Sequence, residues 1–346
     1  MLPEQLDRLR PSCPACRIAG REPEPLALGT VAREDGGDIR EGVLVCPEAA
    51  CRREHPIIDG IPVVVADLAG WAAHQLDSVL RREDLSPFLQ TLIGDAAGPG
   101  SAYDRDRLHV SGYAHAHYDE GGGFPSVVDA AIGLLDPPAV DGLWIDTGCA
   151  TGGATVELAR RGAELAVGVD LSFAVLRAAE RVRREGRARY ALRRVGLAYD
   201  ERDVDVPGVA PDRIAYWCAD VAALPFGDGA FAGALSLNVL DCVPSPLGHL
   251  LELGRVLAPG TSALLCTPYD WSSAATGPDQ WIGGHSQRGG SEGSSVAELR
   301  RVLSGDAGVE TGLRVVAERD GVYWRVRSHE RASVEYALDL LRLERA

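Results

Sequence analysis

From Leu143 onward, short apolar runs alternate with amphipathic stretches, and this alternation constrains the fold more than any other feature of the chain. The apolar runs have strand length and the amphipathic stretches have helical spacing, so together they predict βα units in a doubly wound, mostly parallel sheet. The expected strands are residues 143–147, 165–170, 214–218, 230–237, 261–267 and 313–318. The expected helices include residues 153–161, 173–185, 247–257 and 296–303.

The chain upstream of this alternation has a different character. Residues 69–93 and 127–135 carry apolar side chains at helical spacing, and a Gly- and Tyr-rich linker runs between them. We therefore expect a small N-terminal domain at 1–66, a helical linker and lid at 67–137, and the sheet domain at 138–346. Residues 186–213 form a charged insertion, and residues 283–295, rich in Gly and Ser, are either a gate that closes on substrate or a surface loop.

Composition excludes several functions. All 35 basic residues are arginine, which excludes a phosphate-loop lysine and a Schiff-base lysine. The net charge of −15 disfavours nucleic acid as a partner. No apolar run is long enough to span a membrane and the first ten residues are charged, so we expect a cytoplasmic protein.

Four of the eight cysteines form two close pairs near the N-terminus, Cys13-Pro-Ala-Cys16 and Cys46-Pro-Glu-Ala-Ala-Cys51. A polar, Gly-rich segment that suits a hairpin separates them. In a cytosolic chain this pattern favours four thiolates around one structural zinc over disulfides, with free thiols as the alternative. Because four cysteines complete a tetrahedron, we interpret His55 as a surface residue. The remaining thiols lie in or beside apolar runs and are interpreted as small hydrophobic residues: Cys149, Cys218, Cys242 and Cys266.

The segment after the second pair reads His55-Pro-Ile-Ile-Asp-Gly-Ile-Pro-Val-Val-Val65, which predicts a closing hairpin. Residues 10–66 resemble the zinc-ribbon-like domains related to the tRNA methyltransferase activator protein. That resemblance implies a stabilising module, or one that binds a protein partner or a second copy of the chain.

Acidic residues follow successive strands of the predicted sheet, where ligands of such folds bind. The first strand runs into Asp146-Thr-Gly148-Cys149-Ala-Thr-Gly152, and its glycines let a ligand approach the backbone. The second ends at Asp170, a carboxylate placed to bind ribose hydroxyls. A nicotinamide dinucleotide would use the same acid, so this pattern alone leaves a dehydrogenase open.

The third strand separates these alternatives, because it ends in Tyr216-Trp-Cys-Ala-Asp220-Val-Ala-Ala-Leu-Pro-Phe226. This succession resembles class I S-adenosylmethionine-dependent methyltransferases, which have a Rossmann-like seven-stranded sheet. The resemblance implies that S-adenosylmethionine is the cofactor. It also implies these contacts with the cofactor: Asp146, Gly148, Cys149 and Gly152 at the methionine end, Asp170 and Leu171 at the ribose, Asp220 and Val221 at the adenine, and Asn238 nearby.

Residues 110–345 further resemble the thiohistidine N-methyltransferase part of ovothiol biosynthesis. The likeness rests on these motifs: His115-Ala-His117-Tyr118, Gly148-Cys-Ala-Thr-Gly152, Asn238-Val-Leu-Asp241, Pro268-Tyr-Asp-Trp271 and Gln280-Trp-Ile-Gly-Gly284. A sulfoxide synthase domain is missing from this sequence, and the zinc-ribbon-like module stands in its place. The resemblance therefore implies N-methylation of a small molecule, an imidazole or amino-acid-derived metabolite, rather than ovothiol itself.

Methyl transfer from a sulfonium requires that the acceptor nitrogen be well oriented more than it requires a strong base. An imidazole nitrogen is already largely neutral near pH 7. We expect Asp241 or His117 to act if a proton acceptor is used, with Tyr269 as a third candidate catalytic residue. The expected substrate contacts are Tyr113, Asn238, Asp241, Tyr269, Trp271 and Trp281. Capping or core packing is the competing interpretation of each of these residues.

Two other functions remain as alternatives. A ribosomal RNA methyltransferase can also carry a zinc ribbon, although residues 1–65 hold eight arginines against eleven carboxylates. A non-catalytic scaffold or activator subunit is the second alternative, which the intact Asp170, Asp220 and glycine positions disfavour.

Overall fold

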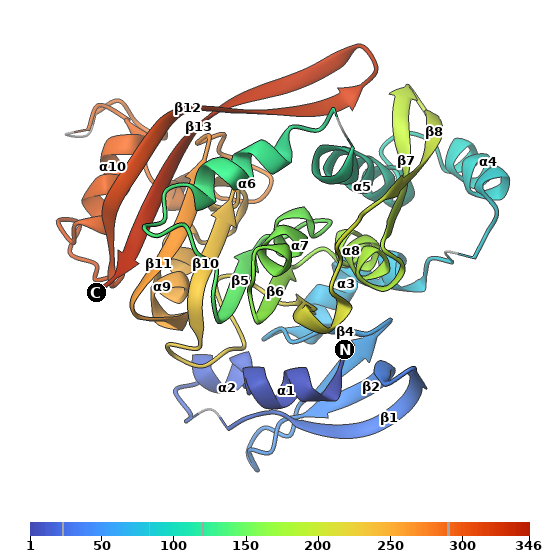
Figure 1. Cartoon of the computed structure of the whole chain (residues 1–346), viewed down its shortest axis with the longest axis horizontal. Helices are drawn as coiled ribbons and strands as arrows, with labels where there is room; N and C mark the ends of the chain where they lie inside the picture. The colour runs from blue at the N-terminus through green and yellow to red at the C-terminus, as the bar shows by residue number, and fades with distance from the viewer. Residues whose placement is uncertain (23, 83, 120, 289–290) are drawn as a thin grey trace.

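The computed structural model describes residues 1–22, 24–82, 84–119, 121–288 and 291–346 (Figure 1). The strands are β1 (Ala27–Asp35), β2 (Asp38–Val45), β3 (Glu54–Ile58), β4 (Ile61–Pro62), β5 (Leu143–Thr147), β6 (Leu165–Asp170), β7 (Arg187–Val195), β8 (Ala198–Asp205), β9 (Ile214–Cys218), β10 (Phe231–Leu237), β11 (Leu257–Thr267), β12 (Leu313–His329) and β13 (Ala332–Arg345). The helices are α1 (Pro3–Leu9), α2 (Pro14–Ile18), α3 (Leu68–Leu80), α4 (Pro87–Ala97), α5 (Ala102–Tyr118), α6 (Phe124–Ile132), α7 (Gly153–Arg160), α8 (Phe173–Glu185), α9 (Pro246–Val256) and α10 (Ser295–Leu303).

Seven strands form the central sheet, in the order β12-β13-β11-β10-β5-β6-β9. The five strands from β11 to β9 run parallel, and the β12–β13 hairpin joins antiparallel at one edge. This arrangement confirms the predicted Rossmann-like, mostly parallel seven-stranded sheet. The chain order reverses beside β5, which opens a crevice at the carboxyl ends of β5 and β10.

Neighbouring residues of each strand face opposite sides of the sheet, because side chains alternate along a strand. On β5, Trp144 packs into one hydrophobic cluster with α6, α7 and α8 residues, while Ile145 packs into a second cluster with α9 and α10 residues. The thiols Cys13 and Cys16 belong to the second cluster. The N-terminal module therefore shares a continuous apolar core with one face of the central sheet.

The N-terminal module is built on a four-stranded sheet, β1-β2-β3-β4, and it contains both hairpins expected from the sequence. Figure 1 shows it below the central sheet, beside α1 and α2. Val63 forms a parallel bridge with Cys218 at the end of β9, and the Val64 amide donates to the Cys218 carbonyl across 2.8 Å. The two sheets are thus joined through backbone hydrogen bonds.

Buried charges also tie the module to the central domain. Arg40 contacts Glu180 of α8 at 3.0 Å, and the guanidinium of Arg183 bonds both Glu180 and Asp38. Arg40, Glu180 and Arg183 are nearly excluded from solvent, so each charge depends on a partner for compensation. Removing Glu180 would leave Arg40 without its ion-pair partner among the described residues.

Two local predictions are wrong. The Gly- and Tyr-rich linker is largely the helix α5, whose buried side includes Asp104, Ser111, His115 and His117 in place of an apolar stripe. The helical spacing of residues 69–93 corresponds to two helices, α3 and α4, and Pro87 starts the second after a break. The last strand continues far beyond residue 318 into the long β12–β13 hairpin.

The charged insertion at 186–213 folds largely as the β7–β8 hairpin. The tip of the β12–β13 hairpin reaches it, where the Glu330 amide donates to the Arg194 carbonyl across 3.0 Å (Figure 1). Both hairpins and α5 thereby enclose the upper end of the sheet. Part of the glycine-rich segment 283–295, at 289–290, lies outside the described residues.

Candidate active site

A cavity of about 210 Å³ lies at the carboxyl ends of the parallel strands. Six of the residues expected to bind the cofactor line it: Gly148, Asp170, Leu171, Asp220, Val221 and Asn238. They follow β5, β6, β9 and β10, so four separate βα units meet at this point. The cavity combines two carboxylates with apolar walls, which suits a nucleoside with ribose hydroxyls and a flat base.

The Asp170 carboxylate organises the turn after β5. Its Oδ2 accepts a hydrogen bond from the Ala150 amide at 3.0 Å, and its Oδ1 accepts from the Ser172 amide at 2.9 Å. Burial raises the pKa of Asp170 above its ordinary value. Ala150 has a φ of 47°, a left-handed conformation that is costly for a residue with a Cβ. The backbone is therefore strained where it lines the cavity, as is common at ligand sites.

Gly148 lets the turn pass close to β10. Its φ is 68°, and a Cβ at this position would lie 2.4 Å from Cγ2 of Val239. Gly152 is equally restricted, because a Cβ there would lie 2.2 Å from the hydroxyl oxygen of Tyr216. Close packing alone therefore requires both glycines of the turn.

Three residues expected at the methionine end do not line the cavity: Asp146, Cys149 and Gly152. Asp146 is buried beneath the turn, where its Oδ2 accepts a hydrogen bond from the Thr155 hydroxyl at 2.7 Å. Burial raises the pKa of Asp146 to about 7. Cys149 is also buried, which agrees with its interpretation as a small hydrophobic residue.

The helix α5 covers the cavity with His117 and Tyr113. Nδ1 of His117 accepts a hydrogen bond from the Gly153 amide at 3.1 Å and lies 3.0 Å from the Thr151 hydroxyl. Its ring stacks on Phe124 with centroids 4.2 Å apart. Burial lowers the pKa of His117 to about 3, so the imidazole is neutral.

A second cavity, of about 560 Å³, adjoins the first. Five residues line both cavities: His109, Tyr113, Asn238, Cys242 and Trp324. Asn238 has a φ of 58°, and its Oδ1 lies 3.2 Å from the thiol of Cys266. The two cavities are thus separated by a shared wall of side chains.

Asp241 lines the second cavity. Its Oδ2 accepts a hydrogen bond from the Asp270 amide at 2.7 Å, whereas its buried Oδ1 has no hydrogen-bond partner among the described residues. Burial raises the pKa of Asp241. A buried carboxylate oxygen without a partner is costly in the empty cavity and is available to a ligand that donates a hydrogen bond.

The three aromatic residues expected around the substrate line neither cavity. Tyr269 lies near the Asp339 side chain of β13 and packs against the second hydrophobic cluster. Trp271 and Trp281 stack on each other with centroids 6.0 Å apart, and Trp271 donates to the Ser295 hydroxyl at 3.0 Å. All three residues form packing contacts in the loops after β11, in agreement with the core-packing alternative.

The second cavity is also lined by residues that the sequence analysis did not single out. Trp324 and Tyr336, from the β12–β13 hairpin, line the second cavity together with Asp270 and His109. The hairpin residues come from a region whose alternating charges resemble a solvated edge, so no motif marked them. Asp270 sits between Tyr269 and Trp271, so the loop that carries this motif lines the second cavity through a neighbouring side chain.

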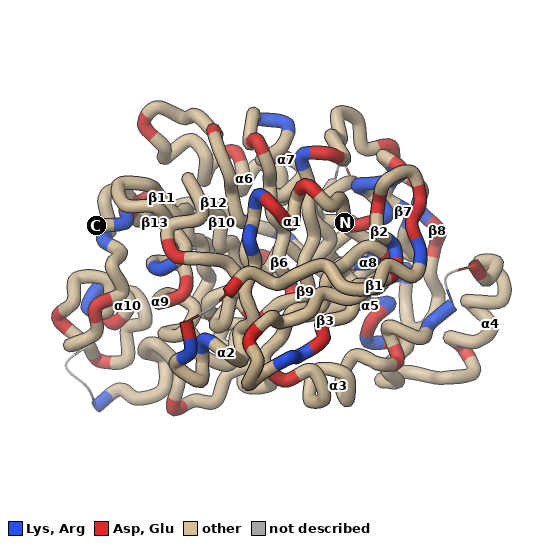
Figure 2. The backbone as a smooth tube through the Cα atoms, turned by 90° about the horizontal axis from the view of Figure 1, so that it is seen from below, with Lys and Arg blue, Asp and Glu red and all other residues tan. Residues whose placement is uncertain are grey.

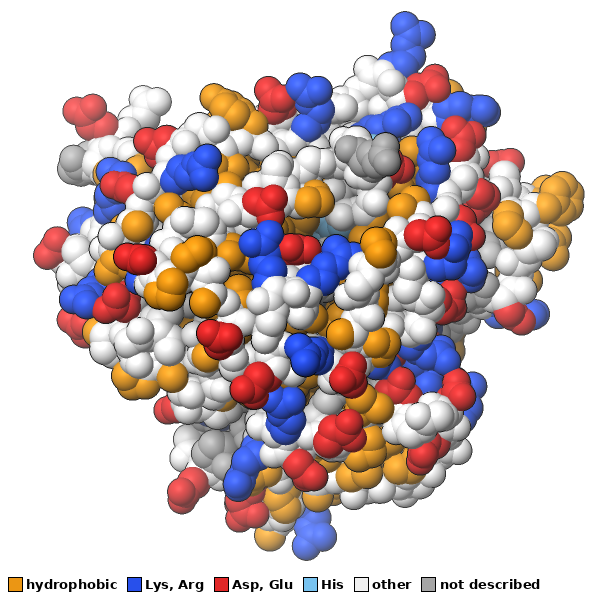
Figure 3. Space-filling model, in the orientation of Figure 1, with side chains coloured by type: hydrophobic (Ala, Val, Ile, Leu, Met, Phe, Trp, Pro, Cys, Tyr) orange, Lys and Arg blue, Asp and Glu red, His pale blue; other side chains and the backbone are white. Residues whose placement is uncertain are grey.

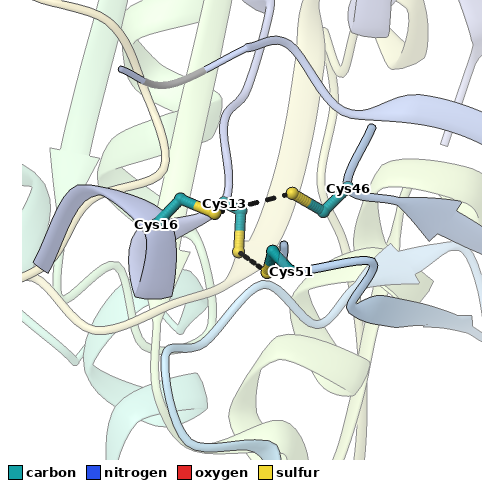
Figure 4. A group of neighbouring side chains, drawn as sticks. All are labelled: Cys13, Cys16, Cys46 and Cys51. Carbon is teal, nitrogen blue, oxygen red and sulfur yellow. Dashed lines mark hydrogen bonds between the residues drawn. The ribbon is translucent and has the colours of Figure 1, made fainter. Parts of the chain in front are cut away.

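The four N-terminal thiols converge beneath the central sheet (Figure 4). Their sulfur atoms all lie within 4.8 Å of one another, with Cys13 and Cys51 3.9 Å apart and Cys16 and Cys46 3.7 Å apart. Sulfurs bound tetrahedrally to zinc at about 2.3 Å would be about 3.8 Å apart. The four cysteines could therefore hold a metal ion as they stand.

His55 is not a surface residue, contrary to our interpretation of the sequence. It is 1% exposed, and neither ring nitrogen has a hydrogen-bond partner among the described residues. It lies outside the thiol cluster. Burial lowers the pKa of His55 to about 4, so it is a neutral core residue.

One family model matches part of the chain. Residues 145–265, roughly a third of the chain, match the family model described as a methyltransferase domain. A search of curated proteins gave no match. None of the helices in the described ranges is both long and apolar enough to cross a membrane.

Several solved structures are similar. Magnesium protoporphyrin IX methyltransferase from Synechocystis, with bound S-adenosylmethionine, is 19% identical, with 77% of this chain and all of that chain covered and a TM-score of 0.42. A complex of the Haloferax volcanii Trm112 methyltransferase activator with a methyltransferase is 15% identical, with 77% and 99% covered and a TM-score of 0.42. A protein that converts a disulfide into a thioacetal in echinomycin biosynthesis is 18% identical, with 62% and 80% covered and a TM-score of 0.42.

The matched segment, residues 145–265, contains β5, β6, β9 and β10, the strands whose ends form the first cavity. The carboxylates of Asp170 and Asp220 lie there as a nucleoside cofactor requires. This segment matches a methyltransferase domain, and together with the two carboxylates at the strand ends the match supports an S-adenosylmethionine-dependent enzyme.

Proposed function

We propose that this enzyme methylates a nitrogen of a small molecule, an imidazole or another amino-acid-derived metabolite. The observation that carries the proposal is the adjoining pair of cavities, in which Asp241 and Asp270 lie across a shared wall from the cofactor cavity. A cavity of about 560 Å³ suits a metabolite. The likeness to thiohistidine N-methyltransferases supports an imidazole nitrogen as the acceptor.

Bound S-adenosylmethionine supplies an electrophilic methyl group. In our proposal Asp170 and Leu171 hold the ribose, Asp220 and Val221 hold the adenine, and Asn238 lies where the two ligands meet. Tyr113 and Trp324 line both cavities and exclude water from the reacting atoms.

Asp241 is our candidate for the group that orients the nitrogen and takes up its proton. Its unpartnered Oδ1 can accept a hydrogen bond from a substrate N–H. His117, the other residue considered for this role, has its Nδ1 lone pair occupied by the Gly153 amide. We therefore assign His117 to holding the cofactor cavity in shape. Tyr269, Trp271 and Trp281 are assigned to loop packing.

We further propose that the four thiols hold one structural Zn²⁺, on the spacing of the sulfur atoms. The zinc-ribbon-like domain at 1–66 would then stabilise the methyltransferase domain at 138–346, with the helical lid at 67–137 between them. Its outer surface, around β1, is where a protein partner or a second copy would bind.

Ribosomal RNA is not our proposed substrate. Acidic and basic residues are mixed along the backbone in Figure 2, and the face in Figure 3 likewise shows red and blue side chains intermingled. The net charge of −15 and the mixed charges of this face (Figure 3) both disfavour binding of an RNA backbone.

The test uses methyl-labelled S-adenosylmethionine, a metabolite extract and ribosomal RNA, with mass spectrometry of the products. We expect label on a nitrogen of a small molecule, and label on RNA alone would contradict the proposal. Asp241→Asn should lower the rate of transfer by about 10- to 100-fold while the Kd of the cofactor stays within about twofold. The matched control is Asp228→Asn, an exposed carboxylate outside both cavities.

A further inference from the structure

Three arginines line the cavity that we assign to the substrate: Arg105 on α5, Arg193 on β7 and Arg327 on β12. Within the described ranges, none of the three forms an ion pair. Their neighbours do, for example Arg187 with Asp203 and Arg325 with Glu335. Other arginines in the described ranges, such as Arg107 and Arg342, also lack an ion pair, but Arg105, Arg193 and Arg327 line one cavity.

Arg327 and Arg193 are the two that are partly buried. Nε of Arg327 is buried and has no hydrogen-bond partner in the part of the chain that the structure describes. Arg193 is held at both ends of the residue, since its amide donates to the Ser111 hydroxyl at 3.0 Å and its Nε donates to the Gly196 carbonyl at 2.9 Å. A positive charge fixed at a cavity wall without a counter-ion favours an anionic ligand.

Asp106 also lines this cavity, but its carboxylate is already paired. Oδ2 of Asp106 accepts hydrogen bonds from the Ser78 hydroxyl and the Arg81 guanidinium, both at 2.6 Å. Asp106 therefore does not cancel the charge of Arg193 and Arg327.

Asp241 and Asp270 also line this cavity, next to the wall that it shares with the cofactor cavity. They come from the segments after β10 and β11, whereas Arg193 and Arg327 come from the β7–β8 and β12–β13 hairpins. The cavity therefore carries carboxylates and guanidinium groups on different elements of the fold.

We infer that Arg193 and Arg327 form an anion subsite that holds a carboxylate or phosphate of the substrate. This inference rests on the proposed function and narrows its substrate class. The substrate is a bipolar molecule, with its basic nitrogen at Asp241 and an anionic oxygen group at Arg193 and Arg327. Arginine suits both anions, because its planar fork donates two parallel hydrogen bonds to a carboxylate or phosphate.

The experiment measures binding of small probes by calorimetry, with and without saturating S-adenosylhomocysteine, so it does not depend on turnover. The probes share an imidazole ring and differ in their tails: imidazole-4-acetate carries a carboxylate, histidinol phosphate a phosphate, and histamine an ammonium. We expect at least one anionic probe to bind about tenfold or more tightly than histamine. Which anionic probe binds more tightly distinguishes a carboxylate from a phosphate substrate.

Arg193→Gln and Arg327→Gln should each abolish most of this preference while S-adenosylhomocysteine binds as before. The matched control is Arg107→Gln, because Arg107 stacks over Tyr199 at 3.9 Å and lines neither cavity. Equal affinity for anionic and cationic probes would overturn the inference, as would an equal loss in all three variants. Failure of S-adenosylhomocysteine to bind the wild-type protein would instead contradict the proposed function.

Discussion

The backbone amide of Gly153 donates a hydrogen bond to Nδ1 of His117 across 3.1 Å. Because an amide can only donate, Nδ1 must be unprotonated, and the ring carries its proton on Nε2. Gly153 is the first residue of α7, where backbone N–H groups have no partner within the helix. His117 thus caps a helix that begins at the cofactor turn, although it belongs to another helix.

This geometry predicts different effects for two substitutions of His117. Asn can offer its side-chain oxygen in place of Nδ1, so His117→Asn should keep most of the stability, whereas His117→Phe should lose about 1–2 kcal/mol. Neither should shift the pH profile of methyl transfer between about pH 5.5 and pH 8, because the pKa of His117 is about 3. Loss of an apparent pKa near neutrality in either variant would mean that His117 is the proton acceptor.

Asp170→Asn should weaken binding of S-adenosylmethionine by roughly 10- to 100-fold, the effect of losing hydrogen bonds to a charged group. The single side-chain oxygen of Asn can accept from only one of the Ala150 and Ser172 amides, so we also expect a loss of about 1–2 kcal/mol of stability. Calorimetry and thermal unfolding measure the two effects. The control is the exposed Asp212→Asn, and unchanged affinity in Asp170→Asn would refute the ribose contact.

Metal analysis of the purified protein should return close to one zinc per chain. Cys13→Ser and Cys46→Ser should lose the metal and unfold at a lower temperature, because Cys13 and Cys46 lie in the apolar core shared with the central sheet. Cys242→Ser, which lies outside the cluster, should keep the metal. A metal-free wild-type preparation with an unchanged melting temperature would argue against the zinc proposal.

Acid should destabilise the protein partly through His249, which is fully buried and hydrogen-bonded at 2.8 Å to the Ser236 hydroxyl. Burial lowers the pKa of His249 to about 4. The unfolded chain binds a proton below about pH 6.5 and the folded chain does not, so stability is lost as pH falls from about 6.5 towards 4.

The loss attributable to His249 is about 2 kcal/mol between pH 7 and pH 5. His249→Gln should make the pH dependence of the unfolding free energy shallower by that amount. The exposed His74→Gln is the control, measured by denaturant titration at each pH. Parallel curves for wild type and His249→Gln would contradict the prediction.

The central βα units were predictable because local pattern and burial agree there. The bounds of β5, β6, β9 and α8 match those expected, since each strand is a short apolar run that is buried on both faces. The helix α5 was missed for the opposite reason. Its buried side holds polar residues that line cavities or pair with neighbours, so no apolar stripe marks it.

The cofactor cavity was more predictable than the substrate cavity. Residues at the ends of parallel strands point to a common edge, so Asp170 and Asp220 could be located from sequence alone. The substrate cavity depends on backbone conformation after β11. Tyr269 adopts a φ of 56°, and its side chain lies against β13 while Asp270 lines the cavity. The spacing of a motif does not show which of two adjacent residues faces a cavity.

The backbone bridge between Val63 and Cys218 determines how this protein can be divided. A fragment that begins after Val65 would leave β9 as an open strand, with unpaired N–H and C=O groups that invite pairing between molecules. Such a truncated methyltransferase should aggregate even where its cofactor residues are intact. We therefore expect the N-terminal segment to limit self-association of the central sheet.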